Sequence, residues 1–239
     1  MTLRQFTIVL SSFWYRISFL GMSWAKRVGA SLDTRKRPRG EEDRVMSNLK
    51  TIGLSVLLSL PVAAYGLEQS VEPDQVPTKK QTTLGYYLTP SEAHDALEQT
   101  PEIVFIDVRD PKEATFVGLP DSVDAVVPLM TVADEFLPDK GKYAMTPNPA
   151  FLDQVAGIVE REGRGKDEIL FVICQSGGRT AKAVNALAKA GYSKVYALFE
   201  GIEGDLNKET GHRDLNGWKN AGLPWGYTMT ETQAWQPKE

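Results

Sequence analysis

Residues 174–179, with the sequence CQSGGR, hold the side chains of this chain that are best suited to chemistry. Cys174 is the single cysteine among 239 residues, and it directly follows an apolar run. Gly177 and Gly178 permit positive φ and close backbone approach, so a turn here can point successive N–H groups inward. A helix that starts after the turn adds the positive end of its dipole. Both effects favour an anion at the centre of the loop, which Cys174 can supply as a thiolate, the nucleophilic form of the thiol.

Arg179 adds a permanent positive charge whose donors suit an oxyanion such as thiosulfate, sulfate or phosphate. Two reactions fit this loop: transfer of a sulfane sulfur through a persulfide on Cys174, or attack of the thiolate on phosphorus. The spacing favours sulfur transfer, because cysteine-dependent phosphatases place five residues between the cysteine and the arginine, and here there are four. The structural alternatives are an inert buried thiol at Cys174 and, for Arg179, a bond to a nearby carboxylate.

Strand and helix patterns alternate from Leu84 onward, which predicts an α/β fold with a largely parallel sheet. Right-handed crossovers place the helices of such a fold on both faces of the sheet, and ligands bind at the carboxyl ends of its strands. Such ends of predicted strands hold Cys174 and Asp107, with Arg109 two residues further on. We expect strands at 103–107, around Val126, at 168–174 and at 194–199, with helices at 89–99, 148–165 and 179–192.

Capping signals fix the ends of these predicted helices. Thr89 and Glu92 form a T-x-x-E capping box around Pro90, which suits the first helical position. Asn148 is the expected cap of the second helix, and Gly191 the residue that ends the third.

Three segments in the expected order resemble the rhodanese-like domain, a sulfurtransferase family. FIDVRDPKEA (105–114) is similar to the family's D-V-R-x-x-x-E element, CQSGGRTAKAVNALAKAGY (174–192) to its C-x-S-G-x-R loop and helix, and NAGLPW (220–225) to the close of the domain. The resemblance implies one domain at 84–227 with a central, mostly parallel sheet of about five strands. It also implies transfer of a sulfane sulfur from a donor such as thiosulfate to an acceptor such as cyanide or a thiol.

The same resemblance assigns roles within the site. Cys174 would carry the persulfide and the backbone amides of residues 175–179 would cradle it, while Asp107 and Arg109 would support the loop through buried ion pairs. No metal or cofactor is implied. The residues expected to bind substrate are Gln175, Ser176, Gly177, Gly178 and Arg179.

The sequence departs from the family pattern in two places. Residues 117–128 lack the usual histidine, and residues 200–218 are longer than usual. We expect this longer segment, with Glu203 and Asp205, to lie beside the site and to select the donor or acceptor, with His212 on the surface and Trp218 as a packing anchor. A non-catalytic, sulfur-sensing or binding module is the alternative function.

The two ends of the chain lie outside the predicted domain. Residues 46–66 have a short basic start, an apolar run of about 13 residues and small residues before Gly66, which is the pattern of a secretory signal peptide. The run is short for a membrane span, which needs about 20 residues. We therefore expect a periplasmic or secreted protein, with membrane contact only if the N-terminus is not cleaved. We interpret residues 1–45 as an extension upstream of a start at Met46 or as a second membrane-associated segment. Residues 67–83 are expected to form a flexible lead-in, and residues 228–239 a tail.

Composition limits the classes of partner and ligand that this chain is expected to bind. Ten Lys and Arg against four Asp and Glu lie in residues 1–66, so residues 67–239 are acidic, with 17 against 27, and nucleic-acid binding is not expected. One cysteine allows no internal disulfide or CxxC pair, and with two histidines it is too few for a structural zinc site. The expected partners are a small-molecule sulfur donor and acceptor, or a protein thiol.

Overall fold

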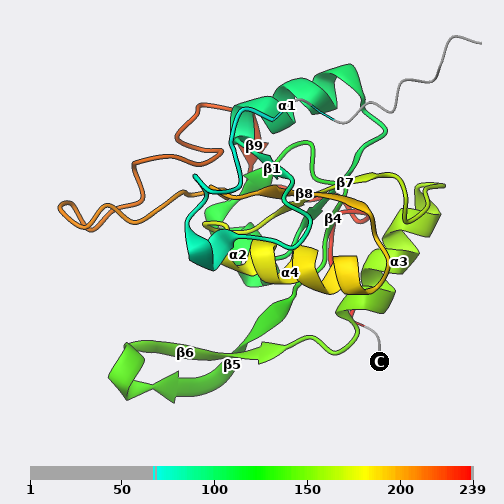
Figure 1. Ribbon diagram of the computed structural model, residues 1–239. Helices are drawn as coiled ribbons and strands as arrows, with labels where there is room; N and C mark the ends of the chain where they lie inside the picture. The colour runs from blue at the N-terminus through cyan, green and yellow to red at the C-terminus, as the bar shows by residue number, and fades with distance from the viewer. Residues whose placement is uncertain (1–66, 68, 238–239) are drawn as a thin grey trace, which may run out of the picture. The chain divides into compact units, whose positions relative to one another are not determined.

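A five-stranded parallel sheet forms the centre of the computed structural model, which describes residues 67 and 69–237 (Figure 1). The strand order is β1-β8-β7-β2-β4. Strands β2, β7 and β8 are continuous apolar runs, as is usual for strands covered on both faces. Their bounds are β1 Tyr87–Leu88, β2 Val104–Asp107, β4 Ala125–Val126, β7 Ile169–Ile173 and β8 Lys194–Leu198.

Helices cover both faces of this sheet. Apolar side chains of α3 (Phe151–Arg161) and α4 (Gly178–Lys189) pack on one face. Those of α1 (Pro90–Gln99), together with Ala114 of α2 (Pro111–Val117), pack on the other. The predicted fold class, an α/β rhodanese-like sheet of about five parallel strands between helices, is confirmed.

Local capping signals were reliable at two of the three helices that the sequence predicted. The capping box of Thr89 and Glu92 is present at α1, and Gly191 follows the end of α4 with a φ of 94°. At α3 the prediction was wrong, because the N-cap residue is Ala150 rather than Asn148. The Asn148 side chain instead accepts a hydrogen bond from the Ala150 N–H, at 3.1 Å, in the turn that precedes the helix.

A long hairpin and a second small sheet were not predicted. Strands β5 (Met130–Leu137) and β6 (Lys142–Pro147) pair antiparallel around the 3-10 turn η2 (Pro138–Lys140), and the hairpin projects away from the main sheet (Figure 1). Strands β3 (Leu119–Pro120) and β9 (Trp225–Gly226) form the second antiparallel pair.

The segments that flank the predicted domain also pack against it. The expected flexible lead-in contains the 3-10 turn η1 (Thr78–Lys80), and Val76 and Lys80 are buried there. In the tail, the Gln233 carbonyl accepts a hydrogen bond from Val126 N–H of the edge strand β4, at 2.8 Å. The predicted extension and signal peptide, residues 1–45 and 46–66, lie outside the described residues.

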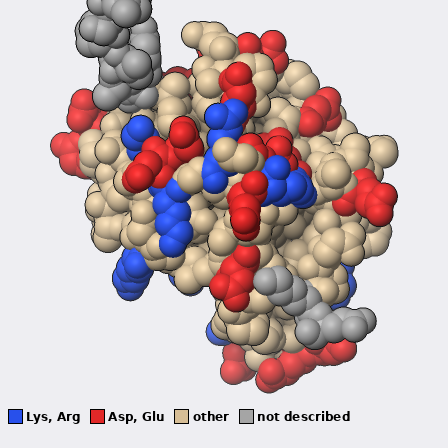
Figure 2. All heavy atoms as spheres, turned by 90° about the vertical axis from the view of Figure 1, so that its right-hand side faces the viewer, with Lys and Arg blue, Asp and Glu red and all other residues tan. Residues whose placement is uncertain are grey.

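The surface and the helices of the described part of the chain each bear on possible partners. Basic and acidic side chains are interspersed on the face shown in Figure 2, so this face presents no continuous basic area. Within residues 67 and 69–237, no helix has the length and apolar character needed to cross a bilayer.

Candidate active site

Cys174 lies at the carboxyl end of β7, in the middle of the sheet, and is buried with only 1% of its surface exposed. Strand β7 is held between β2 and β8, where Ile173 pairs with Asp107 and Val172 with Ala197. The flanking strands therefore fix the position of Cys174, and the chain leaves the sheet at this residue to form the loop that leads into α4.

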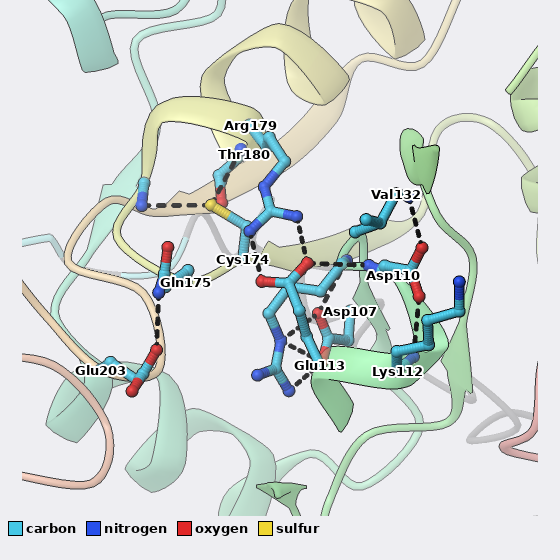
Figure 3. Close-up of polar contacts among 12 residues, drawn as sticks. Asp107, Asp110, Lys112, Glu113, Val132, Cys174, Gln175, Arg179, Thr180 and Glu203 are labelled. Carbon is cyan, nitrogen blue, oxygen red and sulfur yellow. Dashed lines mark hydrogen bonds and ion pairs between the residues drawn. The ribbon is translucent and has the colours of Figure 1, made fainter. Parts of the chain in front are cut away.

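Two backbone amides, one at the end of this loop and one in the first turn of α4, donate to the sulfur (Figure 3). Sγ of Cys174 accepts hydrogen bonds from the Gly177 N–H at 3.2 Å and from the Thr180 N–H at 3.4 Å. Gly177 caps α4 with a φ of 89°, a conformation that residues with a Cβ rarely adopt. The first N–H groups of a helix have no partner within the helix, so they are free to bond a group in the loop.

The chain after β8 holds the loop from the other side. The N–H groups of Ile202 and Glu203 donate to the carbonyls of Cys174 and Gln175, at 2.8 and 3.0 Å. The Gln175 side chain also donates to the Glu203 carboxylate at 2.7 Å. The predicted position of residues 200–218 beside the loop therefore holds for its first residues, while His212 is exposed and Trp218 is fully buried in the core.

Arg179 is bonded to Glu113 of α2. Its Nη2 donates to Glu113 Oε1 at 2.7 Å and its Nη1 donates to Oε2 (Figure 3). Burial alone would lower the pKa of Arg179, but the hydrogen bonds and charge of Glu113 raise it, with smaller contributions from Cys174 and Asp107. The guanidinium is therefore held as a cation near the sulfur by a carboxylate of the protein.

Asp107 and Arg109 form a fully buried ion pair beneath the loop. Nε and Nη2 of Arg109 donate to Asp107 at distances between 2.7 and 3.0 Å, and Nη2 also donates to the Gly118 carbonyl at 2.6 Å. Burial alone would lower the pKa of Arg109, but the charge of Asp107 and its hydrogen bonds raise it. The pair ties the end of β2 to the start of β3, on the strand that neighbours β7.

The structure places some of the residues that were expected to bind substrate, 175–179, in contact with the sulfur. Of residues 175–179, Gly177 has the amide that donates to Sγ in the described structure, and Gln175 turns its side chain to Glu203. Thr180, which was not predicted, provides the second donor. Its place directly after Arg179 in the first turn of α4 was the available signal, because N–H groups there lack helical partners.

Comparison with known proteins gives the family. A profile described as "Rhodanese-like domain" matches residues 89–208, which is half of the chain. This protein therefore belongs to the rhodanese-like domain family.

Two related proteins and two solved structures illustrate what this chain is similar to. The protein "Uncharacterized protein RP600" of Rickettsia prowazekii (strain Madrid E) is 27% identical over 139 residues, 57% of this chain and 94% of the relative. "Thiosulfate sulfurtransferase 16, chloroplastic" of Arabidopsis thaliana is 29% identical over 120 residues, 50% of this chain and 77% of the relative. The crystal structure of Rv0390 from M. tuberculosis is 30% identical, covers 59% of this chain and 97% of its own, and has a TM-score of 0.46. The polysulfide-sulfur transferase homodimer from Wolinella succinogenes is 24% identical, covers 59% and 77%, and has a TM-score of 0.35.

Proposed function

We propose that this protein is a sulfurtransferase that carries a sulfane sulfur as a persulfide on Cys174. The observation that supports this most strongly is the sulfur of Cys174, placed at the end of a central parallel strand and bonded by the amides of Gly177 and Thr180. Amide donors stabilise negative charge on sulfur, both in the thiolate that attacks and in the thiolate that is released. A relative named as a thiosulfate sulfurtransferase supports the same function.

The reaction has two steps. In the first, the Cys174 thiolate attacks the outer sulfur of a donor such as thiosulfate, the donor S–S bond breaks, and its electron pair leaves with sulfite. In the second, an acceptor such as cyanide or a thiolate attacks the outer sulfur of the persulfide. The electron pair of that S–S bond returns to Sγ, where the Gly177 and Thr180 amides again meet a thiolate.

The test is formation of thiocyanate by the full chain from thiosulfate and cyanide. We expect turnover with the wild type and none with Cys174→Ser, which keeps the size of the side chain and removes the sulfur nucleophile. Circular dichroism checks that the variant is folded. Hydrolysis of an aryl phosphate without thiocyanate would favour the phosphatase alternative, and a folded wild type with neither activity would favour a binding module.

We further propose that the protein acts in the periplasm or outside the cell, after cleavage near Gly66. The proposal rests on the apolar run within residues 46–66 and on Lys50, which precedes this run. Its partners there would be a small-molecule sulfur donor and acceptor, or a protein thiol. Sequencing the N-terminus of the mature protein tests this: a start near residue 67 is expected, and a start at Met1 or Met46 would contradict it.

A further inference from the structure

The cation predicted to hold a substrate oxyanion is already bonded to a carboxylate of the protein. Both terminal nitrogens of Arg179 donate to Glu113, and the side chains of the pair are 15% and 22% exposed. A bidentate pair of this kind uses the donors that an incoming oxyanion would need. A donor molecule that approaches Cys174 therefore meets a neutralised arginine.

Glu113 is also fixed by its place in α2, independently of Arg179. It is the N3 residue of a capping box, and its Oε2 accepts a hydrogen bond from the Asp110 N–H at 3.1 Å. Asp110 is itself held, since its carboxylate accepts from Lys112 N–H at 2.8 Å and from Val132 N–H at 2.7 Å. To swing away from the site, Glu113 would have to break the cap of α2 as well as the ion pair.

The other charges near the loop are paired or engaged too. Asp107 neutralises Arg109, and Glu203 places a further carboxylate against Gln175. Lys219 donates to the Val117 carbonyl at 2.9 Å, and its Nζ lies 3.5 Å from the centre of the Trp225 ring. The three cations named here, Arg109, Arg179 and Lys219, are matched by three carboxylates. These side chains therefore carry no net positive charge that could offset a reactive thiolate.

We propose that Glu113 makes the Cys174 site selective for sulfur donors with one negative charge over doubly charged donors such as thiosulfate. This inference rests on the proposed sulfurtransferase function. Both donor types follow the same chemistry: the thiolate attacks the outer sulfur, and the electron pair of the S–S bond leaves with sulfite from thiosulfate, or with benzenesulfinate from the monoanion benzenethiosulfonate. The persulfide that remains on Cys174 is the same in both cases.

The matched donors allow a direct test on the full chain, with saturating cyanide as the acceptor. In Glu113→Gln the carboxylate charge is lost and Arg179 becomes available to the donor. We expect kcat/KM for thiosulfate to rise about tenfold and kcat/KM for benzenethiosulfonate to rise only about threefold, because the Coulomb energy of one nearby charge is twice as large for a dianion as for a monoanion. The ratio of the two values is the quantity to compare.

Two variants serve as controls. Glu92→Gln removes the corresponding carboxylate from the capping box of α1, which packs in another part of the fold, and should leave the ratio unchanged. Glu113→Asp keeps the charge and should keep the ratio closer to that of the wild type than Glu113→Gln does.

If Glu113→Gln does not fold, the salt dependence of the wild type can still overturn the inference. Screening weakens repulsion between like charges, so added salt should raise kcat/KM for thiosulfate relative to benzenethiosulfonate. A relative fall with salt, or an unchanged ratio in folded Glu113→Gln, would overturn the selectivity while leaving the proposed function intact. Failure of both donors to leave a persulfide on Cys174 would overturn the proposed function and this inference with it.

Discussion

In the described structure, the groups bonded to the sulfur of Cys174 are hydrogen-bond donors. The two histidines of the chain are placed elsewhere: His94 lies against the ring of Trp218, with centroids 5.9 Å apart, and His212 is exposed. Around the sulfur are the Gly177 and Thr180 amides, with the Arg179–Glu113 pair nearby. The groups at the site therefore suit stabilisation of a thiolate and a persulfide more than proton abstraction.

The hydroxyl of Thr180 is a part of this environment that no contact in the described structure uses. Thr180 is fully buried beside Cys174 (Figure 3), and among the described residues its Oγ1 has no hydrogen-bond partner. A buried hydroxyl without a partner is costly. A bond from this hydroxyl to the sulfur of the thiolate or persulfide would remove that cost.

Substitution of Thr180 tests this role. Thr180→Val has nearly the same shape but cannot donate, so we expect kcat/KM for sulfur transfer to fall about tenfold, the effect of one hydrogen bond to a charged group. Thr180→Ser keeps a hydroxyl and should retain most of the activity. Donor and acceptor kinetics provide the measurement, and equal activity of the two variants would show that the hydroxyl takes no part.

At the scale of elements, the loop between β7 and α4 depends on the close approach of the chain that follows β8. A Cβ added to Gly177 would collide with the carbonyl of Phe199, and one added to Gly201 would come within 2.6 Å of the Cys174 carbonyl oxygen. Both glycines also have positive φ. The geometry around the sulfur is therefore produced by two loops that need glycine at their contact.

Gly177→Ala and Gly178→Ala form a matched pair for this element. Gly177→Ala should lower the free energy of unfolding by about 2 kcal/mol or more and abolish sulfur transfer, because it combines backbone strain with a steric clash. Gly178→Ala lies in the first turn of α4, with no atom within 4 Å of the added Cβ, and should be neutral or stabilising. Urea denaturation measures the free energy of unfolding of the two variants, and thiocyanate formation measures their sulfur transfer. Equal stability of the two variants would refute this account of the loop.

Sequence patterns predicted the elements whose signals are local. The apolar strands β2, β7 and β8, the capping box of α1 and the glycine after α4 all depend on neighbours within a few residues. The hairpin of β5 and β6 was missed because none of its strand residues is buried, so its strands lack the apolar runs of the central sheet. The contact of Arg179 with Glu113 joins residues 66 positions apart, and only tertiary structure reveals it.

For the molecule as a whole, residues outside the predicted domain help to hold the site. Lys80 of the lead-in is 1% exposed, and its Nζ bonds Asp205 at 2.8 Å. Its stem lies next to Gly177, since a Cβ added there would be 3.0 Å from Cδ of Lys80. One side chain thus connects the lead-in, the active-site loop and the segment after β8.

The ion pair of Lys80 and Asp205 should make the free energy of unfolding depend on pH. Burial alone would raise the pKa of Asp205, but the hydrogen bond and charge of Lys80 lower it. A carboxylate with a lowered folded pKa stabilises the fold above its unfolded pKa of about 3.9, and this contribution is lost as the pH falls through the folded pKa. Asp205→Asn should therefore destabilise the protein at neutral pH and much less at about pH 3.

Urea denaturation at the two pH values measures this difference. Asp139→Asn, at an exposed position of the hairpin, is the control and should have little effect at either pH. An effect of Asp205→Asn that is equally large at both pH values would contradict the assigned ion pair.

Mass spectrometry of the full chain after incubation with a sulfur donor shows whether Cys174 carries the transferred sulfur. Both thiosulfate and benzenethiosulfonate should be used, followed by removal of excess donor. We expect a gain of one sulfur atom on the peptide that contains Cys174. Cyanide should remove this sulfur, and folded Cys174→Ser should not acquire it. No gain of sulfur by the wild type from either donor, or an equal gain by Cys174→Ser, would show that Cys174 is not the sulfur carrier.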